Sequence, residues 1–136
     1  MNTKPITLST LAAMKQGGER IVALTCYDAS FCHLLEEAGV QVLLVGDSLG
    51  MVIQGQETTI PVSLDDMVYH SACVARARSR ALILVDMPFL TYATPERALA
   101  SAGRLMREGG AHMVKLEGGG AFVATVQRLT TNGVPV

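Results

Sequence analysis

Four short apolar runs, each followed by a segment of helical periodicity, constrain the fold of this sequence more than any other feature. Each run is four or five residues long and rich in valine, leucine and isoleucine, which is typical of strands buried on both faces. The runs occupy residues 21–24, 42–45, 81–85 and 113–116. A strand followed by a helix is therefore expected four times along the chain.

Helix start signals follow three of the apolar runs. Asp28, Ser63 and Thr94 are good N-cap residues, and a proline after Thr94 suits the first turn of a helix. Residues 8–15 are expected to form one further short helix before the first strand. Residues 134–136 look like the beginning of a fifth strand.

Four consecutive strand–helix units require a parallel sheet that is covered by helices. Such a sheet is either open and doubly wound or closed into a (β/α)8 barrel, and hydrophobic periodicity does not distinguish the two. We expect a single α/β domain over residues 1–136. In both architectures the ligand site lies at the C-terminal ends of the strands.

Composition limits the classes of function. The chain has 136 residues, 49% of them apolar, so a packed core is expected. Its 11 basic and 12 acidic residues form no basic cluster, which argues against nucleic acid as a partner. The apolar runs are too short to cross a membrane and no signal segment opens the chain, so we expect a cytoplasmic protein.

Three cysteines, an odd number, occur without any CxxC spacing. This pattern argues against a disulfide framework and against a structural zinc site. Cys26, Cys32 and Cys73 are expected to be reduced core residues.

Polar residues end the second, third and fourth strands. The second strand runs into Asp47 and Ser48, the third into Asp86, and the fourth carries Lys115 and Glu117 two residues apart. Residues two apart on a strand point to the same face. Three carboxylates and one ammonium are therefore expected to converge at the C-terminal ends of the strands, above one opening of a barrel.

Converging carboxylates repel one another unless a proton or a cation separates them. Oxygen ligands without cysteine or histidine suit a hard divalent ion, and Mg²⁺ keeps positions for water and substrate oxygens. We expect Asp47, Asp86 and Glu117 to form an open magnesium site. For any one of them alone, a helix cap or an ion pair with arginine is the ordinary alternative.

Lys115 has two interpretations. It resembles the Schiff-base lysine of class I aldolases, but a neighbouring metal already supplies an electrophile, so a cation that holds a substrate carboxylate is preferred. His33, His70 and His112 are scattered without metal-ligand spacing and are expected to be structural.

Two glycine-containing segments lie near the predicted site. Residues 49–59 form an unusually apolar loop with two glycines, which fits either a hinged lid or a surface buried by another subunit. Gly118, Gly119 and Gly120 lack the pattern of a phosphate-binding loop and are expected to form a permissive turn between strand and helix.

Three strings identify the sequence more specifically. VGDSLGMVIQGQETTIPV, DMPFLTYATPE and MVKLEGG, in this order and spacing, closely resemble ketopantoate hydroxymethyltransferase, also called 3-methyl-2-oxobutanoate hydroxymethyltransferase. The resemblance runs from about Leu8 to Val136. It implies a (β/α)8 TIM barrel, of which this chain holds the first four units, and a homodecamer. It also implies Mg²⁺ and 5,10-methylenetetrahydrofolate as the one-carbon donor.

The resemblance also implies roles for individual residues. Asp47, Asp86 and Glu117 correspond to the metal-site carboxylates, and Asp47, Ser48, Asp86 and Lys115 to the contacts with the 2-oxo acid 3-methyl-2-oxobutanoate. The product that the resemblance implies is 2-dehydropantoate, in pantothenate biosynthesis. The family's general base, a glutamate, is expected beyond Val136, so no catalytic base is assigned within this chain.

Two other functions remain open from the sequence. One is a magnesium-dependent 2-oxo acid lyase or mutase of the phosphoenolpyruvate-utilising barrels. The other is a fragment that binds metal or assembles with other chains without catalysis. As half of a barrel, the chain alone is expected to associate and to be inactive, because the inward faces of Leu43, Val45, Leu82, Leu84 and Met113 lack the packing that the missing strands would supply.

Overall fold

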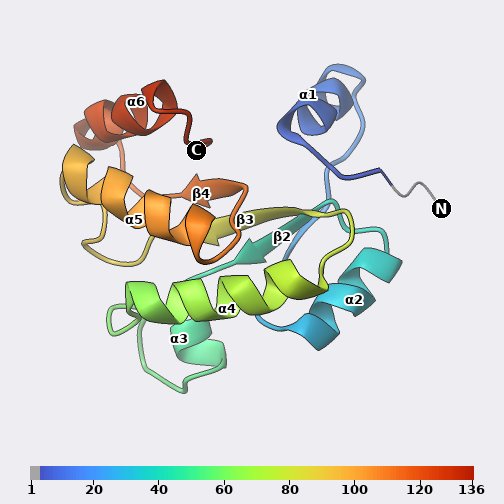
Figure 1. The fold of residues 1–136 in the computed structure, drawn as a ribbon, viewed down its shortest axis with the longest axis horizontal. Coiled ribbons are helices and arrows are strands. Elements are labelled where there is room, and N and C mark those ends of the chain that lie inside the picture. Colours follow the sequence, from blue (N-terminus) through green and yellow to red (C-terminus); the bar gives the residue numbers. More distant parts are fainter. Residues whose placement is uncertain (1–3) are drawn as a thin grey trace.

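The computed structural model describes residues 4–136 and contains four strands in a regular alternation with helices (Figure 1). An N-terminal helix precedes them. The elements are α1 (Leu8–Gln16), β1 (Ala23–Thr25), α2 (Ala29–Glu37), β2 (Val42–Val45), α3 (Leu49–Val52), α4 (Leu64–Ala77), β3 (Leu82–Asp86), α5 (Pro95–Arg107), β4 (Met113–Lys115), the 3₁₀ helix η1 (Gly120–Phe122) and α6 (Val123–Thr131). The predicted strand–helix repeat is confirmed, including the helix expected at residues 8–15.

The strands form one parallel sheet in the order β1-β2-β3-β4. The register pairs Leu43 with Ile83 and Asp86 with Lys115. Strands next to each other in the chain are thus neighbours in the sheet, and every C-terminal strand end lies on the same edge. That edge is where the predicted polar residues gather.

The helices begin at the predicted cap residues. The side chains of Asp28, Ser63 and Thr94 each accept a hydrogen bond from a backbone N–H in the first turn of α2, α4 and α5, respectively. The Asp66 side chain in turn accepts a hydrogen bond from the backbone N–H of Ser63, which completes a capping box on α4. These local signals explain why the helix boundaries follow from sequence.

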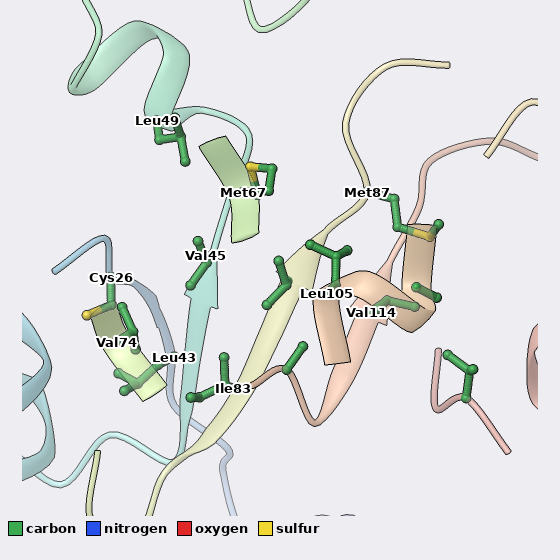
Figure 2. Packing of buried hydrophobic residues seen from close by; sticks show 14 of the residues in the cluster. Cys26, Leu43, Val45, Leu49, Met67, Val74, Ile83, Met87, Leu105 and Val114 are labelled. Atoms are coloured by element: carbon green, nitrogen blue, oxygen red, sulfur yellow. The ribbon is translucent and has the colours of Figure 1, made fainter. Parts of the chain in front are cut away.

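Helices α2, α4, α5 and α6 pack side by side in chain order and cover one face of the sheet (Figure 1). The core lies between this layer and the strands. Figure 2 shows Met67 and Val74 of α4 and Leu105 of α5 against side chains of the strands, and all three are fully buried. Among the residues described, every helix is too short or too polar to span a bilayer.

The expectation that Leu43 and Val45 face the inside of the barrel together with Leu82, Leu84 and Met113 is wrong. Leu43 and Val45 are fully buried, on the face that α4 covers, as are Ile83 and Val85, their partners in register. Because side chains alternate along a strand, Leu84 and its even-numbered neighbours point to the opposite face. A strand with apolar residues on both faces shows no alternation of apolar and polar residues, so its sequence does not indicate which side chains face the helices.

Two further sequence expectations differ from the structure. Residues 134–136 form no strand, although Val114 N–H donates to the carbonyl of Pro135 at 3.0 Å, so the segment runs beside β4. Cys73 is only partly buried, whereas Cys26 and Cys32 are buried as expected. All three thiols are free.

Candidate active site

The C-terminal ends of β2, β3 and β4 surround a small cleft. Its volume is about 90 Å³, room for about three water molecules at liquid density. The four predicted charged residues, Asp47, Asp86, Lys115 and Glu117, all line it, together with Thr59, Met87, Phe89, Tyr92 and Leu116. The structure therefore brings together the charged side chains that the sequence placed at separate strand ends.

Asp86 is the most deeply held of these residues. It is 6% exposed and ends β3. Its Oδ1 accepts a hydrogen bond from Lys115 Nζ at 2.7 Å, and its Oδ2 accepts one from the backbone N–H of Asp47 at 3.1 Å. A carboxylate oxygen can accept more than one bond, so both oxygens keep a lone pair for a further partner.

The environment of Lys115 favours its charged form. Burial acts to lower the Lys115 pKa, but the hydrogen bond to Asp86 and the charges of Asp86, Glu117 and Asp47 outweigh burial and raise it above the ordinary value of 10.5. A Schiff base forms from a neutral amine. The raised pKa therefore favours the interpretation of Lys115 as a fixed cation.

Asp47 carries negative charge that its surroundings only partly compensate. Its pKa is raised above 3.8, first by burial and then by the charge of Asp86, while Lys115 and a hydrogen bond from Thr59 act in the opposite direction. A carboxylate with a raised pKa gains from a nearby cation. The pair Asp47 and Asp86 thus has the donor chemistry that a divalent ion requires.

Glu117 stands apart from that pair. Its side chain is 80% exposed, and its Oε1 lies 3.6 Å from Lys115 Nζ. Within residues 4–136, no group of three or more histidine, cysteine or carboxylate side chains is arranged to hold a metal ion. The role of Glu117 as a third ligand remains a prediction.

Gly46 makes the close arrangement at the end of β2 sterically feasible. A Cβ at this position would lie 3.0 Å from Ser48 Oγ and 3.4 Å from Asp86 Oδ2. Contacts of this length are tighter than most real Cβ contacts, so a side chain here would displace one of the two neighbours. The glycine before Asp47 therefore lets the ends of β2 and β3 approach each other.

Ser48 has a partner that the sequence reasoning missed. Its Oγ lies 2.8 Å from the hydroxyl of Tyr27, just beyond the end of β1. The signal was available, because Tyr27 follows the first apolar run much as Asp47 follows the second. The histidines were expected to lie away from this edge, but the Nδ1 of His70 lies 2.8 Å from the Tyr27 carbonyl oxygen.

The segment predicted as a lid begins with an anchored helix. Leu49 of α3 is fully buried, and a Cβ on Gly50 would lie 2.5 Å from Val62 Cγ2, so Gly50 is a packing position and not a free hinge. Gly55 has a φ of +72°. Thr59 brings the end of the segment back to the cleft.

The three glycines after Glu117 form a turn. Gly118 has a φ of +146°, and a Cβ there would overlap the ring of Phe122. The positive φ favours glycine for backbone reasons, and the Phe122 ring leaves no room for a side chain at this position. A larger open groove of about 590 Å³, between α2 and α4, is lined by none of the predicted site residues.

Comparisons with known proteins point to one family. The family model for ketopantoate hydroxymethyltransferase matches residues 5–136. The 3-methyl-2-oxobutanoate hydroxymethyltransferase of Methylococcus capsulatus is 60% identical over 134 residues, which is 98% of this chain and 50% of that protein. The enzyme of the same name from Nitrosococcus oceani is 61% identical over 131 residues, or 96% of this chain and 50% of that protein. The chain spans about half the length of the curated relatives it matches.

Solved structures share the fold at low sequence identity. A crystal structure of 2,3-dimethylmalate lyase, a member of the PEP mutase/isocitrate lyase superfamily, has a TM-score of 0.67 at 16% identity, and covers 96% of this chain and 50% of that one. A structure of oxaloacetate acetylhydrolase has a TM-score of 0.61 at 17% identity, and covers 83% of this chain and 40% of that one. These neighbours are TIM barrels, which favours the closed barrel over the doubly wound sheet.

Proposed function

The chain belongs to the ketopantoate hydroxymethyltransferase family, and we propose from this premise that it forms the metal- and substrate-binding half of such an enzyme. The reaction would transfer a hydroxymethyl group from 5,10-methylenetetrahydrofolate to C3 of 3-methyl-2-oxobutanoate, giving 2-dehydropantoate. The observation that carries the proposal is the cleft in which Asp47, Asp86, Lys115 and Glu117 meet.

The residues present fit a magnesium ion. Asp47 and Asp86 offer hard oxygen donors with free lone pairs, and the raised pKa of Asp47 reflects burial and uncompensated negative charge. Asp47, Asp86 and Glu117 are the residues that would hold the ion. When bound, Mg²⁺ would polarise the keto group of the substrate and so acidify its C3 proton.

Lys115 and Ser48 would orient the substrate. The Lys115 ammonium is held between Asp86 and Glu117, where it can pair with the carboxylate of the 2-oxo acid. The same positive charge would stabilise the negative charge that develops when the C3 proton leaves. The Ser48 hydroxyl, beside Asp47, would donate a hydrogen bond to a substrate oxygen.

The remaining steps are assigned to the other half of the barrel. We place the general base, a glutamate, and the folate contacts beyond the matched segment. The base would remove the C3 proton, and C3 would then bond to the methylene carbon as one of that carbon's two bonds to folate nitrogen breaks. Water would replace the second nitrogen and supply the hydroxyl group, so that tetrahydrofolate leaves. The likeness to 2,3-dimethylmalate lyase is one of fold and carries no argument for carbon–carbon cleavage.

We also propose a homo-oligomer, a decamer by family resemblance, located in the cytoplasm. Phe31 and Leu34 on α2 are each 58% exposed, which is unusual for large apolar side chains unless another surface covers them. Three free cysteines fit a reducing compartment. No role in binding nucleic acid or membrane is proposed.

The test uses this chain alone and a joined protein, defined as this chain followed by the second half of the Methylococcus capsulatus relative. We expect the joined protein to catalyse Mg²⁺-dependent hydroxymethyl transfer and to exchange the C3 hydrogen of 3-methyl-2-oxobutanoate with deuterium. Asp86→Asn should reduce exchange by about 10²-fold or more, because a charged donor is lost while its shape remains.

Asp65→Asn is the matched control, since the Asp65 side chain is 80% exposed and pairs with Arg104 on α5. It should leave exchange unchanged. Undiminished exchange in Asp86→Asn would refute the role of Asp86. A joined protein that folds but never transfers the hydroxymethyl group would refute the proposed function.

A further inference from the structure

Tyr27 joins the end of β1 to the polar cluster at the ends of the other strands. Its hydroxyl oxygen lies 2.8 Å from Ser48 Oγ in a partly buried contact. Its ring packs against the hydrophobic core cluster. We infer that Tyr27 is a positioning residue that fixes the Ser48 hydroxyl for contact with the 2-oxo acid, an inference that rests on the proposed function.

Tyr27 is itself held from two sides. Just before it, Cys26 N–H donates to the carbonyl of Leu44 at 2.9 Å, which extends the pairing of β1 with β2 by one bond. The Tyr27 carbonyl oxygen accepts a hydrogen bond from Nδ1 of His70 on α4 at 2.8 Å. Since a carbonyl oxygen only accepts, this Nδ1 carries the hydrogen. The tyrosine therefore has a fixed main chain and a packed ring.

Ser48 needs such support at the start of α3. It is the N-cap residue of that helix, yet its hydroxyl makes no capping bond. An unsupported serine side chain samples three staggered rotamers. The bond with Tyr27 selects one of them.

The direction of this bond decides what Ser48 can do. A hydroxyl has one donor hydrogen and can accept two bonds. When Tyr27 donates to Ser48 Oγ, the serine hydrogen is free to point at an oxygen of the substrate. Asp47, the neighbouring residue, lines the cleft, whereas Ser48 is not one of its lining residues. The Ser48 hydroxyl is nevertheless close to it, because a Cβ on Gly46 would lie 3.0 Å from Ser48 Oγ and 3.4 Å from Asp86 Oδ2. Tyr27 thus prepares a hydrogen-bond donor beside the predicted metal ligands without touching the substrate itself.

The expected effect is modest and specific to substrate binding. Restricting Ser48 to one of three rotamers accounts for about threefold in affinity, and polarisation of the serine hydroxyl by Tyr27 can bring the total to about tenfold. Tyr27→Phe should therefore raise the KM for 3-methyl-2-oxobutanoate by about 3- to 10-fold in the joined protein. The kcat should change by less, because the contact is already made in the ground state.

The experiment is a double-mutant cycle with Tyr27→Phe, Ser48→Ala and the double variant. The dissociation constant of 3-methyl-2-oxobutanoate in the presence of Mg²⁺ is measured by calorimetry on this chain and on the joined protein. Tyr69→Phe is the matched control, because it also removes one tyrosine hydroxyl and its side chain is 66% exposed. Each variant is measured well below its own melting temperature.

We expect Tyr27→Phe to weaken binding, Tyr69→Phe to leave it unchanged, and Tyr27→Phe to add nothing once Ser48 is alanine. Equal losses from Tyr27→Phe with and without the serine hydroxyl would show a general packing effect and overturn the inference. Unchanged binding in Tyr27→Phe would overturn it as well. If the 2-oxo acid binds but no hydroxymethyl transfer occurs, the proposed function fails while the cycle still decides the role of Tyr27. If the unaltered proteins bind no 2-oxo acid, both the proposed function and the inferred role of Tyr27 are refuted.

Discussion

Lys115 Nζ lies 2.7 Å from Asp86 Oδ1 and ties the end of β4 to the end of β3. The register of the sheet places the two residues directly opposite each other. A parallel sheet brings the last residues of neighbouring strands to one edge, so this ion pair follows from the topology. It also keeps the lysine protonated, which determines the chemistry open to it.

The first prediction concerns Lys115 as a cation. Borohydride reduction of the joined protein with 3-methyl-2-oxobutanoate should leave no lysine-linked adduct by mass spectrometry. Lys115→Met should weaken binding of the 2-oxo acid by about 10-fold or more, because a charge-assisted hydrogen bond is lost. A trapped adduct would show that the amine acts as a nucleophile.

The second prediction uses the same variant to test the electrostatics of the cleft. The Lys115 charge holds the Asp47 pKa down, against burial and the charge of Asp86. Lys115→Met should therefore raise the Asp47 pKa further, as measured by carboxyl NMR titration. The control is Lys15→Met. Lys15 lies on α1, before the first strand, and its replacement should leave the Asp47 titration unchanged.

The third prediction concerns Glu36, which fastens the end of α2 to the turn before β3. Its Oε2 accepts bonds from the Ser79 N–H and hydroxyl at 2.7 and 2.6 Å. Its Oε1 accepts bonds from the N–H groups of Arg80 and Ala81 at 2.8 and 2.6 Å. Glu36→Gln should lower the free energy of unfolding by about 2 kcal/mol, allowing for partial exposure, because an amide NH₂ group must face donors.

The pH dependence of Glu36 has a definite sign. Burial opposes ionisation, but the four hydrogen bonds outweigh it and lower the Glu36 pKa from 4.5 to about 2. The stabilisation is full above pH 4.5 and is lost as the pH falls from 4.5 towards 2. Urea unfolding across that range should show a larger loss in the unaltered chain than in Glu36→Gln, which keeps the carboxylates of Asp66 and Glu108, whose pKa values are also lowered. Glu37→Gln, at an exposed neighbour, should behave like the unaltered chain.

The sequence was sufficient for the strand–helix order and for the charged residues of the cleft, for a common reason. Helix caps such as Ser63 act locally, and the last residues of parallel strands, such as Asp86, must share one edge. These features depend on short-range chemistry and on topology. Neither requires knowledge of side-chain packing.

What the sequence missed depends on packing between distant segments. Leu43 and Leu84 are both apolar, and only the position of α4 shows that Leu43 lies beneath the helices. The hydrogen bond between Tyr27 and Ser48 joins residues 21 positions apart. The sequence shows that Tyr27 follows the first apolar run, but not that its hydroxyl reaches Ser48. The sequence suggests a hinge at Gly50, but a Cβ there would lie 2.5 Å from Val62 Cγ2, a closeness that only the packing reveals.

The fourth prediction concerns His112, whose Nδ1 accepts the backbone N–H of Ile83 at 3.0 Å. Burial, and then the charge of Arg78, lower the His112 pKa below 6.5. Its contribution to stability is therefore present above pH 6.5 and is lost as the pH falls through the folded-state pKa. His112→Leu should destabilise the chain by about 1–3 kcal/mol at pH 7.5, because the Ile83 N–H loses its acceptor.

Urea unfolding at pH 7.5 and 5.5 distinguishes this effect from that of Glu36, whose range lies lower. The difference between the unaltered chain and His112→Leu should shrink at pH 5.5. His33→Gln, at an exposed histidine of α2, is the control. A constant difference at both pH values would contradict the prediction.

The last prediction compares two glycines that differ in what a side chain would meet. At Gly46 a Cβ would lie 3.0 Å from Ser48 Oγ and 3.4 Å from Asp86 Oδ2, whereas at Gly103, within α5, it would meet nothing within 4 Å. Gly103→Ala should raise the free energy of unfolding by about 0.5–1 kcal/mol, since alanine is the better helix former, and leave 2-oxo acid binding unchanged. Gly46→Ala should shift Ser48 or Asp86 by a few tenths of an ångström and weaken binding by about 3- to 10-fold. Calorimetric titration and urea unfolding of both variants check the pair. Equal binding of the 2-oxo acid by the two variants would mean that the close approach of the strand ends at Gly46 does not affect binding.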